Sequence, residues 1–310
     1  MESSNLEVFL RAATPHLPWR SATMDCFEGG PSSVWQLDRE IKKSDAAVGY
    51  FALADLWEHY AESSAYGLAV PVRHHGGRTA AENTVVTQHF VPYLSAVQLY
   101  TATRPTVVSL AIPRSTGSET DSWSDDSAGG GERFARSSWD AASEDDDDSA
   151  YYVAASSYLN FQYREWDSPY DRVPLADKVS ELAQEYPCLM SLRSAELSPS
   201  SWMSVAWYPI YHIPAHGNMK GISTCFLTYH SISSVFQDNI QRSGPERDGG
   251  DTTVLSPFGM STYRMEGDLW RRPGSSDRRR LSELHWAASS WLKQVGAHHP
   301  DFAFFTSHHR

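Results

Sequence analysis

Apolar residues recur at helical spacing in several parts of the chain, which predicts amphipathic helices at residues 4–13, 52–64, 175–186 and 281–296. In the second of these segments, Leu53, Leu56 and Trp57 fall on one face. Ser4 and Glu7 form a capping-box pattern at the start of the first, because each side chain can bond the other residue's backbone N–H. We therefore expect helices that each present one apolar face to a core.

Segments rich in β-branched and aromatic residues separate these helices, at residues 85–100, 151–166, 197–214, 225–232 and 258–270. The first reads as one or two strands interrupted by Pro92. In residues 202–211 both alternating phases are apolar, so we expect that strand to be covered on both faces, with helices on one side. Pro209 has no N–H to donate, which predicts a bulge or an edge there. The pattern predicts an α+β fold, with an antiparallel or mixed twisted sheet flanked by helices.

Residues 114–149 differ from the rest in composition. They contain 11 acidic and 3 basic residues, so they carry −8 of the net charge of −12, and they have almost no aliphatic side chains. Such a segment buries too little apolar surface to offset chain entropy. We predict one globular domain over residues 1–310, with a long disordered acidic insert at 114–149.

Five hydroxyl residues of the insert have an acidic residue three places later, the spacing that acidophilic kinases of the casein-kinase-two type favour. Phosphorylation would add about −1.5 to −2 charges at each site. A passive solubilising insert is the alternative reading. The candidate phosphorylation sites are Thr116, Ser118, Ser122, Ser137 and Ser143.

The composition excludes several classes of protein. The 11 Trp, 15 Tyr and 12 Phe supply ample apolar surface for a core, so the chain is not disordered throughout. The acidic balance opposes nucleic-acid binding, which needs a basic face. The three cysteines are widely spaced, and we find neither a secretory signal nor an apolar run of membrane length. We expect an intracellular protein of the cytoplasm, the nucleus or both, without a membrane role.

Common catalytic and nucleotide-binding motifs are absent from the sequence, which indicates no cofactor. The 13 histidines include adjacent pairs at residues 74–75, 298–299 and 308–309. Adjacent side chains diverge on regular structure, whereas zinc ligands come at converging spacings, so we predict no metal site. We assign no catalytic residue, and the sequence favours a non-enzymatic role.

Aromatic and histidine side chains near Pro209 form a candidate ligand pocket, although a strand core needs the same residue types. The candidate residues are Trp207, Tyr208, Tyr211, His212 and His230. His230 paired with Asp177 or Glu58 would make an acid–base pair, and its alternative is a core histidine bonded to backbone.

A split basic cluster precedes the last predicted helix. It is interpreted as a nuclear-import signal, a phosphate-binding patch, the solvated start of that helix, or a counter-surface for the acidic insert. Its members are Arg271, Arg272, Arg278, Arg279 and Arg280.

Several longer phrases extend along the chain, at residues 5–10, 53–58, 64–67, 91–95, 174–178, 199–202, 205–211, 225–230 and 299–302. In these phrases the chain resembles the land-plant proteins grouped as domain of unknown function 789. The resemblance covers essentially the whole chain and implies a plant source and an intracellular location. It implies no activity for any residue.

The leading hypothesis is a protein-interaction or regulatory module whose acidic insert is phosphorylated, with an unidentified protein partner and an acidophilic kinase. The alternative is an enzyme or small-ligand protein that uses the aromatic pocket. A concave pocket with two converging titratable groups would favour the alternative.

Overall fold

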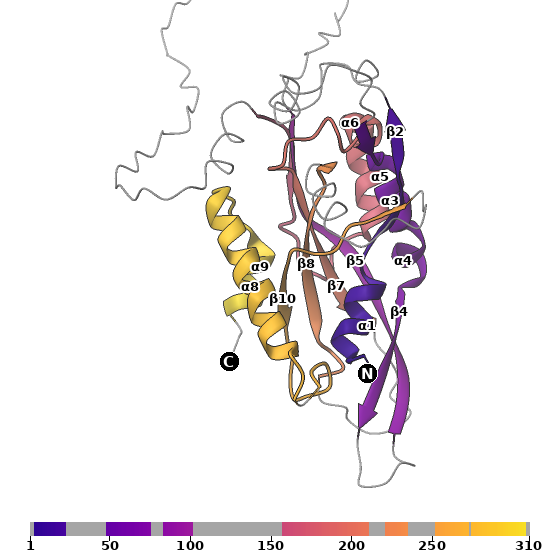
Figure 1. Cartoon of the computed structure of the whole chain (residues 1–310), viewed down its shortest axis with the longest axis vertical. Helices are drawn as coiled ribbons and strands as arrows, with labels where there is room; N and C mark the ends of the chain where they lie inside the picture. The colour runs from indigo at the N-terminus through magenta and orange to yellow at the C-terminus, as the bar shows by residue number, and fades with distance from the viewer. Residues whose placement is uncertain are drawn as a thin grey trace, which may run out of the picture. The chain divides into compact units, whose positions relative to one another are not determined.

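The computed structural model describes residues 3–22, 48–75, 83–101, 157–210, 221–234, 252–272 and 274–307 (Figure 1). The acidic insert and its candidate phosphorylation sites lie outside the described residues, as do Tyr211 and His212. All described residues belong to one compact unit, formed by Met1–Arg104 and Val153–Arg310.

A six-stranded antiparallel sheet forms the centre of this unit, in the order β10-β8-β7-β5-β4, with β6 also pairing β5. The segments before and after the insert share this sheet, because β5 pairs with both β6 and β7. The α+β prediction is therefore confirmed, with an antiparallel sheet. The strands are β4 (Leu68–His75), β5 (Asn83–Thr101), β6 (Tyr158–Arg164), β7 (Trp202–Pro209), β8 (Cys225–Ser231) and β10 (Gly259–Tyr263).

Two small antiparallel pairs lie beside the main sheet. The first joins β1 (His16–Pro18) to β9 (Thr252–Val254). The second joins β2 (Arg20–Ala22) to β3 (Val48–Tyr50). The first pair brings the end of the N-terminal segment next to the segment that leads into β10.

Pro92 and Pro209 are the two prolines of the sheet for which the sequence made a prediction. Pro92 does not interrupt its strand. On one side of β5, β4 pairs only as far as Phe90, and β6 pairs only from Ala96 onward. Strand β5 therefore has one neighbour, β7, at Pro92 and tolerates a missing donor there. Pro209 ends β7 and pairs there only with β5, because β8 pairs with β7 no further than Trp207, so Pro209 lies at a local edge as predicted. No bulge lies there, because the register shift is in β5, after Leu94.

Helices cover both faces of the sheet rather than one (Figure 1). On one face Leu6 and Leu53 pack with Trp207, and on the other Ala288 and Phe305 pack with Trp202. Successive side chains of β7 point alternately into these two cores, which explains why both of its alternating phases are apolar. The helices are α1 (Asn5–Ala12), α3 (Leu53–His59), α4 (Ala61–Tyr66), α5 (Leu175–Glu185), α6 (Cys188–Ser191), α8 (Asp277–Gln294) and α9 (Pro300–Ser307).

The helix boundaries refine the sequence prediction. The capping box at Ser4 and Glu7 is present in both directions. The single helix expected at 52–64 is two helices that meet at Tyr60, whose fully buried ring occupies the core. Pro187 directly precedes α6, and α9 was not anticipated.

Candidate functional site

The three candidate pocket residues that the structure describes, Trp207, Tyr208 and His230, do not lie together. Trp207 and His230 are fully buried on the face that α1 covers, whereas Tyr208 belongs to the core on the other face. Successive residues of a strand point to opposite faces, so Trp207 and Tyr208 cannot line one cavity. A pocket at Tyr211 and His212 stays a prediction.

His230 takes part in a linear hydrogen-bond chain within the core, and both of its ring nitrogens have a partner there. Its Nδ1 lies 2.8 Å from the carbonyl oxygen of Leu255, which only accepts, so Nδ1 carries the proton. Its Nε2 then accepts from the Thr228 hydroxyl at 3.0 Å, and that oxygen accepts from Trp207 Nε1 at 3.1 Å. Burial lowers the pKa of His230 to about 4, so the ring is neutral. Both nitrogens are occupied, which leaves no place for Asp177 or Glu58.

A second buried cluster superficially resembles a Ser-His-Asp triad. His299 Nε2 lies 2.8 Å from Ser204 Oγ, and Asp301 follows two residues later. However, His299 Nδ1 accepts the backbone N–H of Phe302 at 3.1 Å, so the proton of the neutral ring is on Nε2. A triad needs the opposite tautomer, in which Nε2 accepts the serine proton. His299 thus caps the first turn of α9, and burial lowers its pKa to about 4.

Asp301 anchors the same helix through a buried ion pair. Both of its carboxylate oxygens accept from Arg172, at 2.8 and 2.7 Å, and Ser95 Oγ donates to it as well. The side chains of Arg172 and Asp301 are 4% and 5% exposed. The bidentate geometry and the extra donor compensate for the loss of water. This cluster is structural, and it fixes α9 against the sheet.

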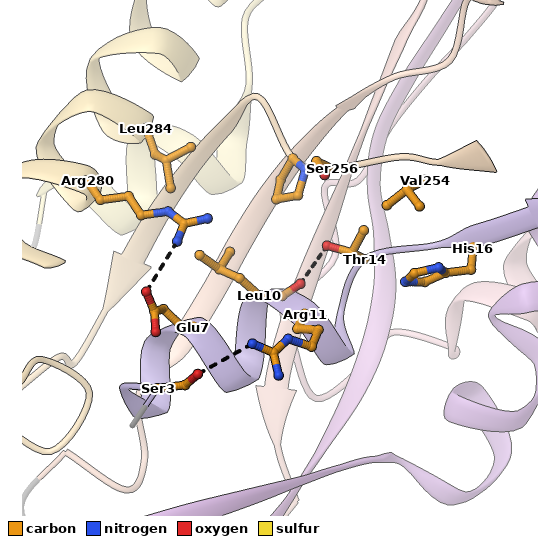
Figure 2. Close-up of a pocket in the computed structure, with 11 residues that line it drawn as sticks. Ser3, Glu7, Leu10, Arg11, Thr14, His16, Val254, Ser256, Arg280 and Leu284 are labelled. Atoms are coloured by element: carbon orange, nitrogen blue, oxygen red, sulfur yellow. Dashed lines mark hydrogen bonds and ion pairs between the residues drawn. The ribbon is translucent and has the colours of Figure 1, made fainter. Parts of the chain in front are cut away.

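The surface has a pocket of about 490 Å³ between α1, α8 and residues 254–257 (Figure 2). Glu7, Leu10 and Arg11 of α1 form one wall, and Arg280 and Leu284 of α8 form the other. Figure 2 shows Arg280 directed toward Glu7 and Arg11 directed toward Ser3. His16 lies at the opposite end from Glu7, so these two groups do not converge as an acid–base pair.

The charged groups of this pocket have weak partners. Arg11 donates to Ser3 Oγ at 3.4 Å, and Arg280 lies 4.0 Å from Glu7 Oε1, with about half of its side chain exposed. Glu7 is already used by the α1 cap, since its Oε2 accepts the N–H of Ser4. The two guanidinium groups therefore retain most of their donors for a bound group.

A second, more open hollow of about 660 Å³ continues from the first, because Arg280 and Leu284 line both. Phe258 and Trp286 contribute its aromatic lining, and Trp286 is 71% exposed. We call the two hollows together the α1–α8 groove, lined by Glu7, Leu10, Arg11, Phe258, Arg280, Leu284 and Trp286.

The arginines of the predicted basic cluster separate into two groups. Arg271 donates to the carbonyl of Gly267 at 2.6 Å, and the backbone N–H of Arg272 donates to Asp277, so both belong to the turn before α8. Arg278, Arg279 and Arg280 lie in the first turn of α8. The helix dipole adds partial positive charge at that end, which strengthens the field of the exposed arginines.

The sequence prediction missed Arg11 and Trp286. Trp286 lies off the apolar stripe of its helix, and a large aromatic residue on a polar helix face was the signal available. Arg11 had no such signal, because its proximity to α8 depends on the tertiary fold.

Two further properties follow from the described residues. Over the described ranges, no group of three or more His, Cys, Asp or Glu side chains could hold a metal ion. In the same part of the chain, no helix is both long and apolar enough to span a membrane.

Comparison with known proteins places the chain in a family. The model of the family described as protein of unknown function (DUF789) matches residues 4–305, so the chain belongs to that family. Searches of curated proteins and of solved structures gave no match.

Proposed function

We propose that this member of the DUF789 family is a non-enzymatic protein-interaction module that binds an acidic segment of a partner protein in the α1–α8 groove. One observation carries the proposal: weakly paired Arg11 and Arg280 share a continuous surface with the exposed ring of Trp286. Arginine and tryptophan are the residue types that most often dominate binding energy at protein interfaces. An acidic segment with an apolar side chain complements both parts of the groove.

We also propose that the acidic segment at 114–149 regulates this binding after phosphorylation by an acidophilic kinase. Each phosphate would add about −1.5 to −2 charges, so the modified protein would repel an acidic partner more strongly. The cytoplasm or nucleus is the proposed location, because Cys188 and Cys225 are free thiols and such compartments keep thiols reduced. The proposed sites are Thr116, Ser118, Ser122, Ser137 and Ser143.

Affinity purification with mass spectrometry tests the proposal. The tagged full chain is compared with Arg280→Gln and Trp286→Ala, and with Lys293→Gln as the control, since Lys293 is an exposed cation at the far end of α8. Partners that bind the control but not the two groove variants would support the proposal. If the same proteins bind all variants equally, the groove is not the interface and the proposal is wrong.

The regulatory part needs a separate comparison. The purified intact chain is mixed with untreated extract before and after its own phosphatase treatment, so that the partner keeps its phosphates, alongside a variant that lacks residues 114–149. Phosphatase treatment should increase recovery of a groove-dependent partner, and deletion should make recovery insensitive to phosphatase. Recovery that is unchanged by phosphatase would exclude regulation by phosphorylation.

A further inference from the structure

We infer that the α1–α8 groove recognises a phosphate group, carried by a phosphoserine or phosphothreonine within an acidic, partly apolar segment of a partner protein. This inference rests on the proposed function and names the chemistry of its ligand. It is independent of phosphorylation of the chain itself.

The cations of the groove suit a dianion better than a single carboxylate. Arg11 and Arg280 line the same pocket from two different helices, and Figure 2 shows Arg280 directed toward Glu7 and Arg11 directed toward Ser3. A phosphate has three terminal oxygens, and bidentate pairing with guanidinium groups is its strongest form of recognition in proteins. A carboxylate has two oxygens and would satisfy mainly one of the two arginines.

Glu7 sets the limit on this recognition. Its carboxylate faces Arg280 in Figure 2, and its Oε1 is 4.0 Å from Arg280. A bound phosphate must compete with it. The contact is long and half exposed, so Arg280 leaves it at little cost, while Glu7 remains held by the N–H of Ser4.

The apolar half of the groove specifies the rest of the ligand. Phe258, Leu284 and Trp286 follow directly from the cationic half. A peptide whose phosphate binds Arg11 and Arg280 therefore places a neighbouring apolar side chain against Trp286. The groove therefore requires a peptide that has both a phosphate and an apolar side chain, whereas inorganic phosphate lacks the apolar part.

The shape of the groove favours a peptide over an anionic membrane. Its phosphate-binding half is concave, with a volume of about 490 Å³, so it suits a protruding group rather than an extended surface.

Fluorescence anisotropy with the full chain tests the inference. The probe is a labelled acidic peptide with one central phosphoserine and a leucine nearby, and its unphosphorylated form is the comparison. We expect the phosphate to raise affinity at least about tenfold at physiological salt. Arg11→Gln and Arg280→Gln should each remove most of that preference, whereas Lys293→Gln should keep it.

The outcomes separate this inference from the function on which it rests. Equal binding of both peptides, still lost in Trp286→Ala, would overturn phosphate recognition and leave the interaction module standing. Binding of neither peptide would overturn phosphate recognition, while the interaction module is decided by the affinity purification of the groove variants. Tighter binding after removal of residues 114–149, with an unchanged melting temperature, would show that the chain's own segment occupies the groove. That result would overturn the assignment to a partner, as would Arg280-dependent binding to vesicles of phosphatidylcholine and phosphatidylserine without any preference for the phosphopeptide.

Discussion

The interior of the sheet and the α1–α8 groove both contain charged and polar side chains, but they differ in how fully those groups are paired. In the interior, His230 and His299 use both ring nitrogens, and Asp301 accepts three hydrogen bonds. In the groove, Arg11 and Arg280 have one weak contact each among the described residues. The full pairing of His230, His299 and Asp301 indicates that these three groups are structural, whereas free donors at the surface indicate a candidate binding site.

The buried ion pair gives the largest expected effect. Asp301→Ala leaves Arg172 as an uncompensated buried charge, so the free energy of unfolding should fall by about 3–5 kcal/mol in chemical denaturation. Glu181→Ala is the matched control, because its exposed pair with Lys178 at 3.0 Å should contribute only about 0–1 kcal/mol. Similar small effects from both substitutions would contradict a structural role for Asp301.

Acid should destabilise the protein through its buried histidines. His230 and His299 have pKa values lowered to about 4 in the folded state, against 6.5 as the ordinary value. Below pH 6.5 the unfolded chain binds protons that the folded chain does not, so stability should fall with pH until about pH 4. The slope is about 1.4 kcal/mol per pH unit for each histidine. Denaturation measured from pH 7 to pH 4.5 checks this, and a flat profile would show that the rings are not held neutral.

The hydrogen-bond chain in the core should give an intermediate effect. Thr228→Val keeps the shape of the side chain but leaves the Trp207 N–H and His230 Nε2 without their partner. We expect a loss of about 1–3 kcal/mol in the free energy of unfolding. Thr306→Val serves as the control, since Thr306 bonds only the carbonyls of its own helix. An equal loss in the two variants would argue against a stabilising role for the hydrogen bonds of Thr228.

The groove should show the smallest effect on stability. Arg11→Gln and Arg280→Gln should each change the free energy of unfolding by less than about 0.5 kcal/mol, because their contacts are long and exposed. Thermal melts alongside the anisotropy measurements check this. A large loss of stability would show that Arg11 and Arg280 stabilise the fold, as the buried charged groups do.

Much of the fold was predictable because it depends on local pattern. The capping box of Ser4 and Glu7, the helical face at Leu53 and Leu56, and the apolar phases of β7 all involve residues near one another in sequence. The local pattern failed where tertiary contacts decided the outcome. Pro92 lies inside a strand because β4 and β6, on one side of β5, both stop short of it, and the helix break at Tyr60 accompanies a ring buried in the core.

The candidate site was less predictable for the same reason. The basic cluster at 278–280 was visible in sequence, but Arg11 lies far from it along the chain, and only packing of α1 beside α8 brings them to one pocket. The aromatic residues near Pro209 illustrate the opposite error. Trp207 and Tyr208 are adjacent in sequence, yet the alternation of a strand separates them to opposite faces.

The α+β class, most of the helices and strands, and the family could be predicted from the sequence, because periodicity and motifs are properties of neighbouring residues. The structural roles of His230 and His299, and the pocket that Arg11 and Arg280 line together, emerged only from the fold. The physical reason is that a side chain's chemistry depends on its partners and its exposure to water. Those are set by contacts between residues such as Arg172 and Asp301, which are distant in sequence and meet only in the fold.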